Sequence, residues 1–86
     1  MWKIEFTKQA KKDLEKLKSS GLSTNAKILF DTIKNNPYQT PPSYEKLLGK
    51  LSSVYSRRIN RQHRLIYQIF PQLKTIKIIR MWTHYE

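Results

Sequence analysis

Residues 55–67 read Tyr-Ser-Arg-Arg-Ile-Asn-Arg-Gln-His-Arg-Leu-Ile-Tyr, and this stretch decides how the rest of the chain can be arranged. Two runs rich in β-branched and aromatic residues flank a polar triplet at 60–62, a pattern that predicts a β-hairpin. Four of the thirteen residues are arginines, whose planar fork of donors matches the oxygens of a phosphate. Two interpretations follow: a hairpin that binds an anion, or exposed strands whose charge prevents edge-to-edge aggregation.

The length of the hairpin loop decides between them, because side chains alternate along a strand. A loop of odd length at 60–62 pairs Ile59 with His63 and Arg58 with Arg64, so both guanidinium groups share one face of the sheet. A loop of even length would separate them. Like charges directly opposite each other are destabilising unless an anion lies between them. The anion-binding interpretation therefore requires the odd loop.

The composition limits the class of protein. The 86 residues suffice for one domain with a modest core, expected to span 1–86. Cysteine is absent, which excludes disulfides and thiolate metal sites and favours a reducing cytoplasm, and two histidines with few acids make a zinc site improbable. No apolar run approaches the length of a membrane span, and the N-terminus lacks the apolar core of a signal peptide.

The charge points to the partner. The chain carries 17 Lys and Arg against 6 Asp and Glu, a formal net charge of +11. Such an excess favours nucleic acid or an acidic protein as partner and leaves an anionic membrane surface open.

The chain before the hairpin predicts one strand and two helices. Residues 2–6 alternate apolar and polar side chains, as half-buried strands do. Thr7 can cap a helix whose apolar residues recur at helical spacing, and Gly21 is a natural stop for it. A second helix is expected to start at Ser23 and to end at 35–37. The short linker makes the two an antiparallel pair.

The remaining segments complete an α+β fold. Three prolines in 37–43 predict a loop, whereas 44–51 fits either a short strand or an irregular segment. The order β-α-α-β-β-β predicts a small sandwich in which both N-terminal helices pack on one face of a twisted, mostly antiparallel sheet. The three later strands are expected at 54–59, 63–69 and 75–82.

Several motifs taken together resemble one protein family. The chain contains Tyr-Glu-x-Leu at 44–47, Leu-Ser at 51–52, Tyr-Ser-Arg-Arg-Ile at 55–59, His-Arg-Leu-Ile-Tyr at 63–67 and His-Tyr at 84–85. This combination, along the whole length, resembles the YoeB/Txe branch of the RelE-like bacterial toxins. The resemblance implies a RelE-like fold and the toxin half of a toxin–antitoxin pair. It also implies an endoribonuclease (mRNA interferase) that cuts mRNA in the ribosomal A site and so inhibits translation.

The resemblance also implies roles at matching positions. Glu45 corresponds to the general base, Arg58 and Arg64 to the phosphate-binding pair, and His84 to the general acid, while Tyr85 could orient the phosphate or stack on a base. Such a set can cut RNA without a metal or cofactor, because the 2′-hydroxyl is an internal nucleophile that needs only a base, nearby cations and an acid.

Departures from the family pattern are few. Leu48 replaces a usual lysine, Ser53 a glycine and Tyr55 a common tryptophan, and Glu86 extends the chain past the His-Tyr pair. These differences bear on RNA positioning more than on the reaction type.

Other basic residues are candidates for contact with RNA or the ribosome, although a solvated lysine face is the simpler interpretation of the helices. Arg57, on the opposite face from Arg58, is also expected as a surface ion-pair partner facing the antitoxin. His63, on the apolar side of its strand, is expected to be packed rather than catalytic. The candidates are Lys11, Lys12, Lys46, Lys50, Arg57 and Arg61.

The expected partners are a cognate acidic antitoxin of the YefM/Axe type, the ribosome and its mRNA, and the sequence leaves open whether the chain forms a homodimer. Two alternative functions remain: a non-catalytic toxin of the same fold that inhibits a protein such as DNA gyrase, and a plain basic RNA-binding module. The Glu, Arg and His set argues against both.

Overall fold

A computed structural model describes residues 1–47 and 54–82. It confirms the predicted α+β fold, and the undecided segment at 44–51 begins with a strand. The elements are β1 (Lys3–Phe6), α1 (Lys8–Ser19), α2 (Ser23–Asn35), β2 (Tyr44–Lys46), β3 (Val54–Arg58), β4 (Arg64–Phe70), the short 3-10 helix η1 (Pro71–Leu73) and β5 (Thr75–Arg80). No helix in this part of the chain is long and apolar enough to cross a membrane.

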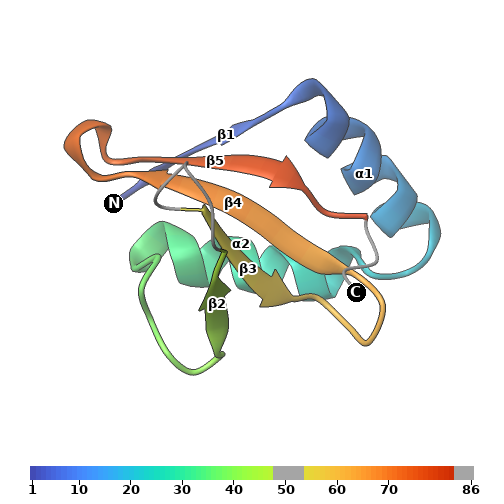
Figure 1. Cartoon of the computed structure of the whole chain (residues 1–86). Helices are drawn as coiled ribbons and strands as arrows, with labels where there is room; N and C mark the ends of the chain where they lie inside the picture. The colour runs from blue at the N-terminus through green and yellow to red at the C-terminus, as the bar shows by residue number, and fades with distance from the viewer. Residues whose placement is uncertain (48–53, 83–86) are drawn as a thin grey trace.

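The strands form one five-stranded sheet in the order β1-β5-β4-β3-β2 (Figure 1). β1 runs parallel to β5, and every other pairing is antiparallel. The edges are therefore β1 and β2, and the arginine-rich hairpin β3–β4 is interior. Edge protection does not explain its arginines, because both of its strands already have a neighbour on each side.

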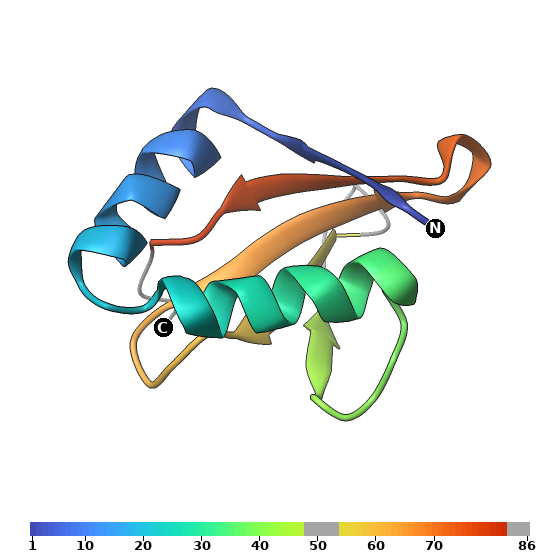
Figure 2. The same ribbon diagram turned by 180° about the vertical axis from the view of Figure 1, so that it is seen from behind.

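Both helices contribute to one core. α2 lies across the sheet, and α1 lies beside the end of β5 (Figure 2). α1 buries Ala10 and Leu17, and α2 buries Leu29 and Ile33, against alternate residues of the strands such as Tyr67. Burial of each large apolar side chain contributes about 1.5–3 kcal/mol, so this cluster supplies most of the drive to fold. Neither α1 nor α2 covers the opposite face of the sheet, which is called the helix-free face below.

The helix ends follow the sequence signals. Thr7 Oγ1 accepts a hydrogen bond from the Ala10 amide at 3.0 Å and donates one to the Ile79 carbonyl at 3.0 Å, so the same side chain caps α1 and ties it to the end of β5. Gly21 has φ of +74°, a conformation that favours glycine, and it ends the first helix. α2 begins at Ser23 as expected, but the capping position is Leu22, which supplies no side-chain hydrogen bond.

The odd hairpin loop is confirmed. The Ile59 amide donates to the His63 carbonyl at 2.9 Å, and Arg58 lies directly opposite Arg64. Asn60 Oδ1 turns the loop by accepting the amides of Gln62 and His63 at 2.9 and 2.7 Å. The arginine pair thus points to the helix-free face of the sheet.

Candidate functional site

A hollow of about 260 Å³ lies on the helix-free face, across strands β2, β3 and β4. Its volume leaves room for a phosphate group or several water molecules. Every side chain of the lining is polar or aromatic, so the site suits a charged, hydrogen-bonding ligand better than an apolar one. The hollow is lined by Ser43, Tyr44, Glu45, Ser56, Arg58 and Arg64.

The register of three strands brings these side chains together. Glu45 on β2 lies opposite Ser56 on β3, and Ser56 lies opposite Ile66 on β4. Arg58 and Arg64 form the next row along the same face, because each is two residues from the first row. Three of the five predicted catalytic residues, Glu45, Arg58 and Arg64, therefore line one hollow.

The charges in the hollow do not cancel. Arg64 Nη1 lies 3.8 Å from Glu45 Oε1 and donates to Ser56 Oγ at 3.2 Å. Arg58 is exposed and makes no hydrogen bond or ion pair with the described residues. One carboxylate thus faces two guanidinium groups, and the remaining positive charge favours an anion between the two arginines.

Arg57 corrects an expectation. The sequence predicts a surface residue that faces RNA or the antitoxin, but the side chain is fully buried. Its guanidinium donates to the Tyr67 hydroxyl at 2.8 Å and to the carbonyls of Pro42 and Pro37 at 2.6 and 3.0 Å, and it lies over the Tyr44 ring. Alternation places it toward the core, where it clamps both ends of the proline-rich loop before β2. With its donors engaged inside the fold, it is not available to a partner here.

Burial and this clamp also affect Tyr67. Burial raises the pKa of the Tyr67 phenol above its usual value of 10.0, and the hydrogen bond and positive charge of Arg57 offset part of that rise. The two side chains therefore form one buried polar unit beneath the hollow.

His63 packs, as expected, rather than entering the hollow. Its side chain is buried, and its ring stacks on Trp82 with centroids 4.0 Å apart and planes 20° apart. Because His63 directly precedes Arg64, this stack places Trp82 beside the end of β4 that begins with Arg64.

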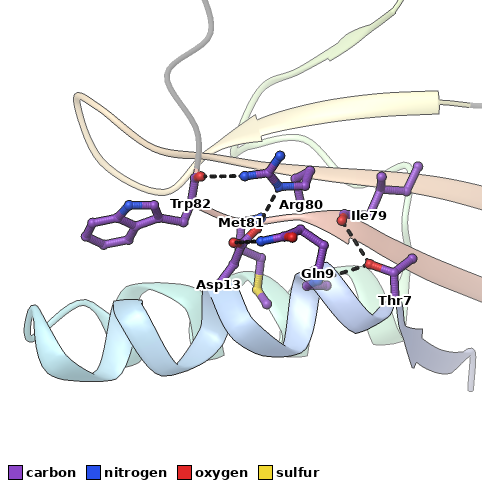
Figure 3. Close-up of polar contacts among 8 residues, drawn as sticks. Thr7, Gln9, Asp13, Ile79, Arg80, Met81 and Trp82 are labelled. Carbon is purple, nitrogen blue, oxygen red and sulfur yellow. Dashed lines mark hydrogen bonds and ion pairs between the residues drawn. The ribbon is translucent and has the colours of Figure 1, made fainter.

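A second polar cluster lies where β5 ends (Figure 3). Asp13 of α1 accepts hydrogen bonds from the Arg80 guanidinium and the Met81 amide, both at 2.9 Å, and from Gln9 at 3.0 Å. Burial alone would raise the pKa of this carboxyl, but the hydrogen bonds from Met81, Gln9 and Arg80 outweigh it and hold the pKa below 3.8.

The other predicted residues are dispersed. Lys11 and Lys12 are exposed on α1, Lys46 is exposed at the end of β2, and Arg61 is exposed in the hairpin loop. None of these four lines the hollow. Lys50, His84 and Tyr85 lie outside the described residues. Within 1–47 and 54–82, no three His, Asp or Glu side chains are grouped so that they could hold a metal ion.

The prediction from the sequence did not include two residues that the structure makes important, Ser56 and Asp13. Ser56 lines the hollow and accepts from Arg64, and its place two residues before Arg58 was a usable signal. Asp13 lies on the apolar stripe of α1, three residues after Ala10 and four before Leu17, and an acid in such a position should have drawn notice.

The fold is that of RelE-like toxins. A YoeB/ParE toxin from Agrobacterium tumefaciens superposes with a TM-score of 0.85 at 24% identity, covering 96% of this chain and 99% of that one. The toxin–antitoxin complex YoeB–YefM from Staphylococcus aureus contains a chain that superposes with a TM-score of 0.80 at 31% identity, over 99% of both chains.

Sequence comparison identifies the family within this class of toxins. The family model for the YoeB-like toxin of bacterial type II toxin–antitoxin systems matches residues 6–85, and the chain belongs to this family. Toxin YoeB of Synechocystis sp. is 36% identical over 59 residues, which cover 69% of this chain and 66% of the relative, just under two thirds of its length. The resemblance noted from the motifs is confirmed.

Proposed function

We propose that this toxin is a ribosome-dependent endoribonuclease that cuts mRNA in the A site by metal-free attack of the 2′-hydroxyl and thereby inhibits translation. The observation that carries the proposal is the hollow in which the opposed Arg58 and Arg64 share one face with Glu45. RNA carries both the anion that this pair fits and the internal nucleophile that a carboxylate can activate.

The reaction assigns one role to each group. Glu45 takes the proton of the 2′-hydroxyl, whose oxygen then attacks phosphorus, and the bond from phosphorus to the 5′-oxygen breaks. Arg58 and Arg64 stabilise the negative charge of the pentavalent phosphorane. His84 donates a proton to the departing 5′-oxygen, and Tyr85 orients the phosphate. The products are a 2′,3′-cyclic phosphate, which can hydrolyse to a 3′-phosphate, and a 5′-hydroxyl.

The base role for Glu45 competes with a plain ion pair to Arg64. An ion pair with a carboxylate that is 69% exposed contributes at most about 1 kcal/mol to stability, so structure alone gives little reason for an acid there. The base role is supported by the position of this carboxylate in the same hollow as both arginines, 3.8 Å from Arg64, because a general base must lie close to the group that it deprotonates.

The acid role for His84 draws support from the described residues before it. Trp82 stacks on His63, next to Arg64, and His84 follows two residues later.

The partners follow from charge and family. The net charge of +11 suits an acidic antitoxin whose binding would cover the basic surface in the bacterial cytoplasm. The Staphylococcus aureus relative is described in complex with YefM, and another structure of it as a dimer. By analogy, we propose that this chain binds an antitoxin of the YefM type. The targets of the toxin itself are the ribosome and mRNA.

The test is a cleavage assay on mRNA-programmed ribosomes beside the same mRNA free in solution, with the cut sites mapped by primer extension. Cuts confined to the A-site codon, and reduced by about 10²–10⁴-fold in His84→Ala and in Glu45→Gln, are expected. Glu45→Gln should still bind ribosomes, which separates a catalyst from a plain RNA-binding module. No cutting by folded protein in either tube would refute the nuclease and favour inhibition of a protein target.

A further inference from the structure

Asp13 holds an unusual position for a charged side chain. It is the acid that the structure buries completely within the described residues, and it does so on the core-facing stripe of α1. Removing a carboxylate from water costs several kcal/mol unless donors replace the lost hydration. An apolar residue, such as Leu17 one turn later, joins α1 to the sheet without that cost. The carboxylate therefore requires a reason other than packing.

Its partners lie at the far end of the chain. Asp13 Oδ2 accepts from Arg80 Nε and from the Met81 amide, each at 2.9 Å, and Oδ1 accepts from Gln9 Nε2 at 3.0 Å. Arg80 Nη2 in turn donates to the Trp82 carbonyl at 3.1 Å (Figure 3). One helix side chain thus bonds Arg80 and Met81 at the end of β5, and reaches Trp82 through Arg80.

These hydrogen bonds fix the orientation of the backbone after β5, which apolar packing would not do. A hydrogen bond to the Met81 amide sets the orientation of that peptide, and the Arg80 bridge sets the next carbonyl along. On the other side, the Trp82 ring stacks on His63, the residue before Arg64. The chain after β5 is therefore oriented from α1 and also held against the hairpin that carries the arginine pair.

We propose that Asp13 is a positioning residue: through Met81 and Arg80 it sets the course of the chain at Trp82, and it acts on cleavage through His84, the proposed general acid two residues later in the sequence. The inference rests on the proposed ribonuclease function for its catalytic consequence. Its structural part, that Asp13 sets the position of Trp82, can be tested without any cleavage assay.

The first experiment reads Trp82 directly. The chain has two tryptophans, so the variant Trp2→Phe leaves Trp82 as the single tryptophan reporter. In this background, Asp13→Asn is expected to increase acrylamide quenching of Trp82, because the ring loses its fixed contact with His63. Glu15→Gln, at an exposed acid of the same helix, is the matched control and should leave quenching unchanged. Equal quenching in both folded variants would overturn the inference.

The second experiment separates positioning from general stability. Asp13→Asn is expected to lower the single-turnover cleavage rate on programmed ribosomes by about 10- to 100-fold with unchanged KM, because a displacement near 1 Å of a reacting group has an effect of this size. In the His84→Ala background the same substitution should cause no further decrease in activity. A decrease of equal size in both backgrounds would mean that Asp13 acts only on folding, and would overturn the inference.

Two outcomes need their own controls. If Asp13→Asn does not fold, Arg80→Gln replaces it in both experiments, since this variant keeps the hydrogen bond from the Met81 amide to Asp13 and removes the Arg80 bonds to Asp13 and to the Trp82 carbonyl. If the wild-type toxin does not cut RNA, the proposed function fails, while the quenching result still decides whether Asp13 positions Trp82.

Discussion

Arg57 and Arg58 are neighbours in the sequence and opposites in the fold. Arg57 points to the core, is fully buried and directs its donors to a tyrosine hydroxyl and two proline carbonyls. Arg58 points to the helix-free face, is exposed and makes no hydrogen bond or ion pair among the described residues. Strand alternation places Arg57 in the core and Arg58 on the exposed face.

The difference shows which arginine is accessible to a ligand and which one stabilises the fold. Arg57 stabilises a loop because it donates hydrogen bonds to two of the loop's carbonyls, and its full burial keeps it from a partner. Arg58 faces the like charge of Arg64 across the hairpin, a destabilising arrangement that an anion between them would relieve. A residue that lowers stability slightly in the free protein is a good candidate for function, whereas its neighbour is expected to matter for folding.

The largest effect is expected when the two arginines that line the hollow are removed. Arg58→Ala and Arg64→Ala are each expected to lower ribosome-dependent cleavage by about 10²–10³-fold, since each removes a charge aimed at the phosphorane. The melting temperature of Arg58→Ala should stay close to that of the wild type, because the side chain makes no contact that folding needs. Full activity in Arg58→Ala would show that the hollow is not the catalytic site.

The complementary change is Arg57→Ala. It leaves the Tyr67 hydroxyl and two carbonyls without donors and opens a cavity, so the free energy of unfolding should fall by about 3 kcal/mol. Chemical denaturation measured beside Arg58→Ala gives the contrast directly. The more conservative Arg57→Met should also raise the pKa of Tyr67 further, since Arg57 lowers it, and spectrophotometric titration of the phenol measures this change. Equal stability of Arg57→Ala and wild type would refute the clamp.

A buried charge of the opposite sign, Asp13, extends the comparison. Its pKa in the folded state lies below 3.8, so its stabilising effect is present above the unfolded-state pKa and is lost as pH falls through the folded-state value. Asp13→Asn should therefore lower the melting temperature at neutral pH by an amount that shrinks below about pH 4. Glu15→Gln, at a carboxylate that is 74% exposed, should change the melting temperature little at any pH. A constant difference between wild type and Asp13→Asn down to low pH would contradict this.

Much of the fold was accessible from local pattern. The hairpin and the cap at Thr7 follow from rules that span a few residues, whereas the shared face of Arg58 and Arg64 was predicted only for an odd loop, which the structure then showed. The position of Glu45 in the same hollow needed the register between β2 and β3, and the family resemblance, not the local pattern, pointed to it.

What the sequence did not reveal depends on distant contacts. Arg57 resembles a surface residue in the sequence because its acceptors, Pro42 and Pro37, lie 15 and 20 residues away. Asp13 meets Arg80 and Met81 across 67 and 68 residues. Local periodicity does not predict either set of contacts. Its one signal is a charged residue on the apolar face of its helix or strand.

The smallest expected effect concerns exposed charge outside the hollow. Lys11 and Lys12 lie on the surface of α1 and line no part of the hollow, so they should act on ribosome binding through contacts with phosphates and not on the chemistry. The double variant Lys11→Ala/Lys12→Ala should leave the single-turnover rate at saturating toxin unchanged. It should weaken ribosome binding and reduce the slope of log affinity against log salt by about 1 for each phosphate that a lysine no longer neutralises.

The matched control for this pair is Lys27→Ala/Lys34→Ala on α2, which removes the same charge from the other helix. A larger change of slope in the α1 pair than in the α2 pair would assign the ribosome contact to α1. An equal change in both pairs would mean that only net charge matters, because long-range attraction does not distinguish one surface from another. A lower cleavage rate in the α1 pair would instead show that exposed charge far from Arg58 also takes part in catalysis, and the division between architectural and functional charge would then extend beyond the hairpin.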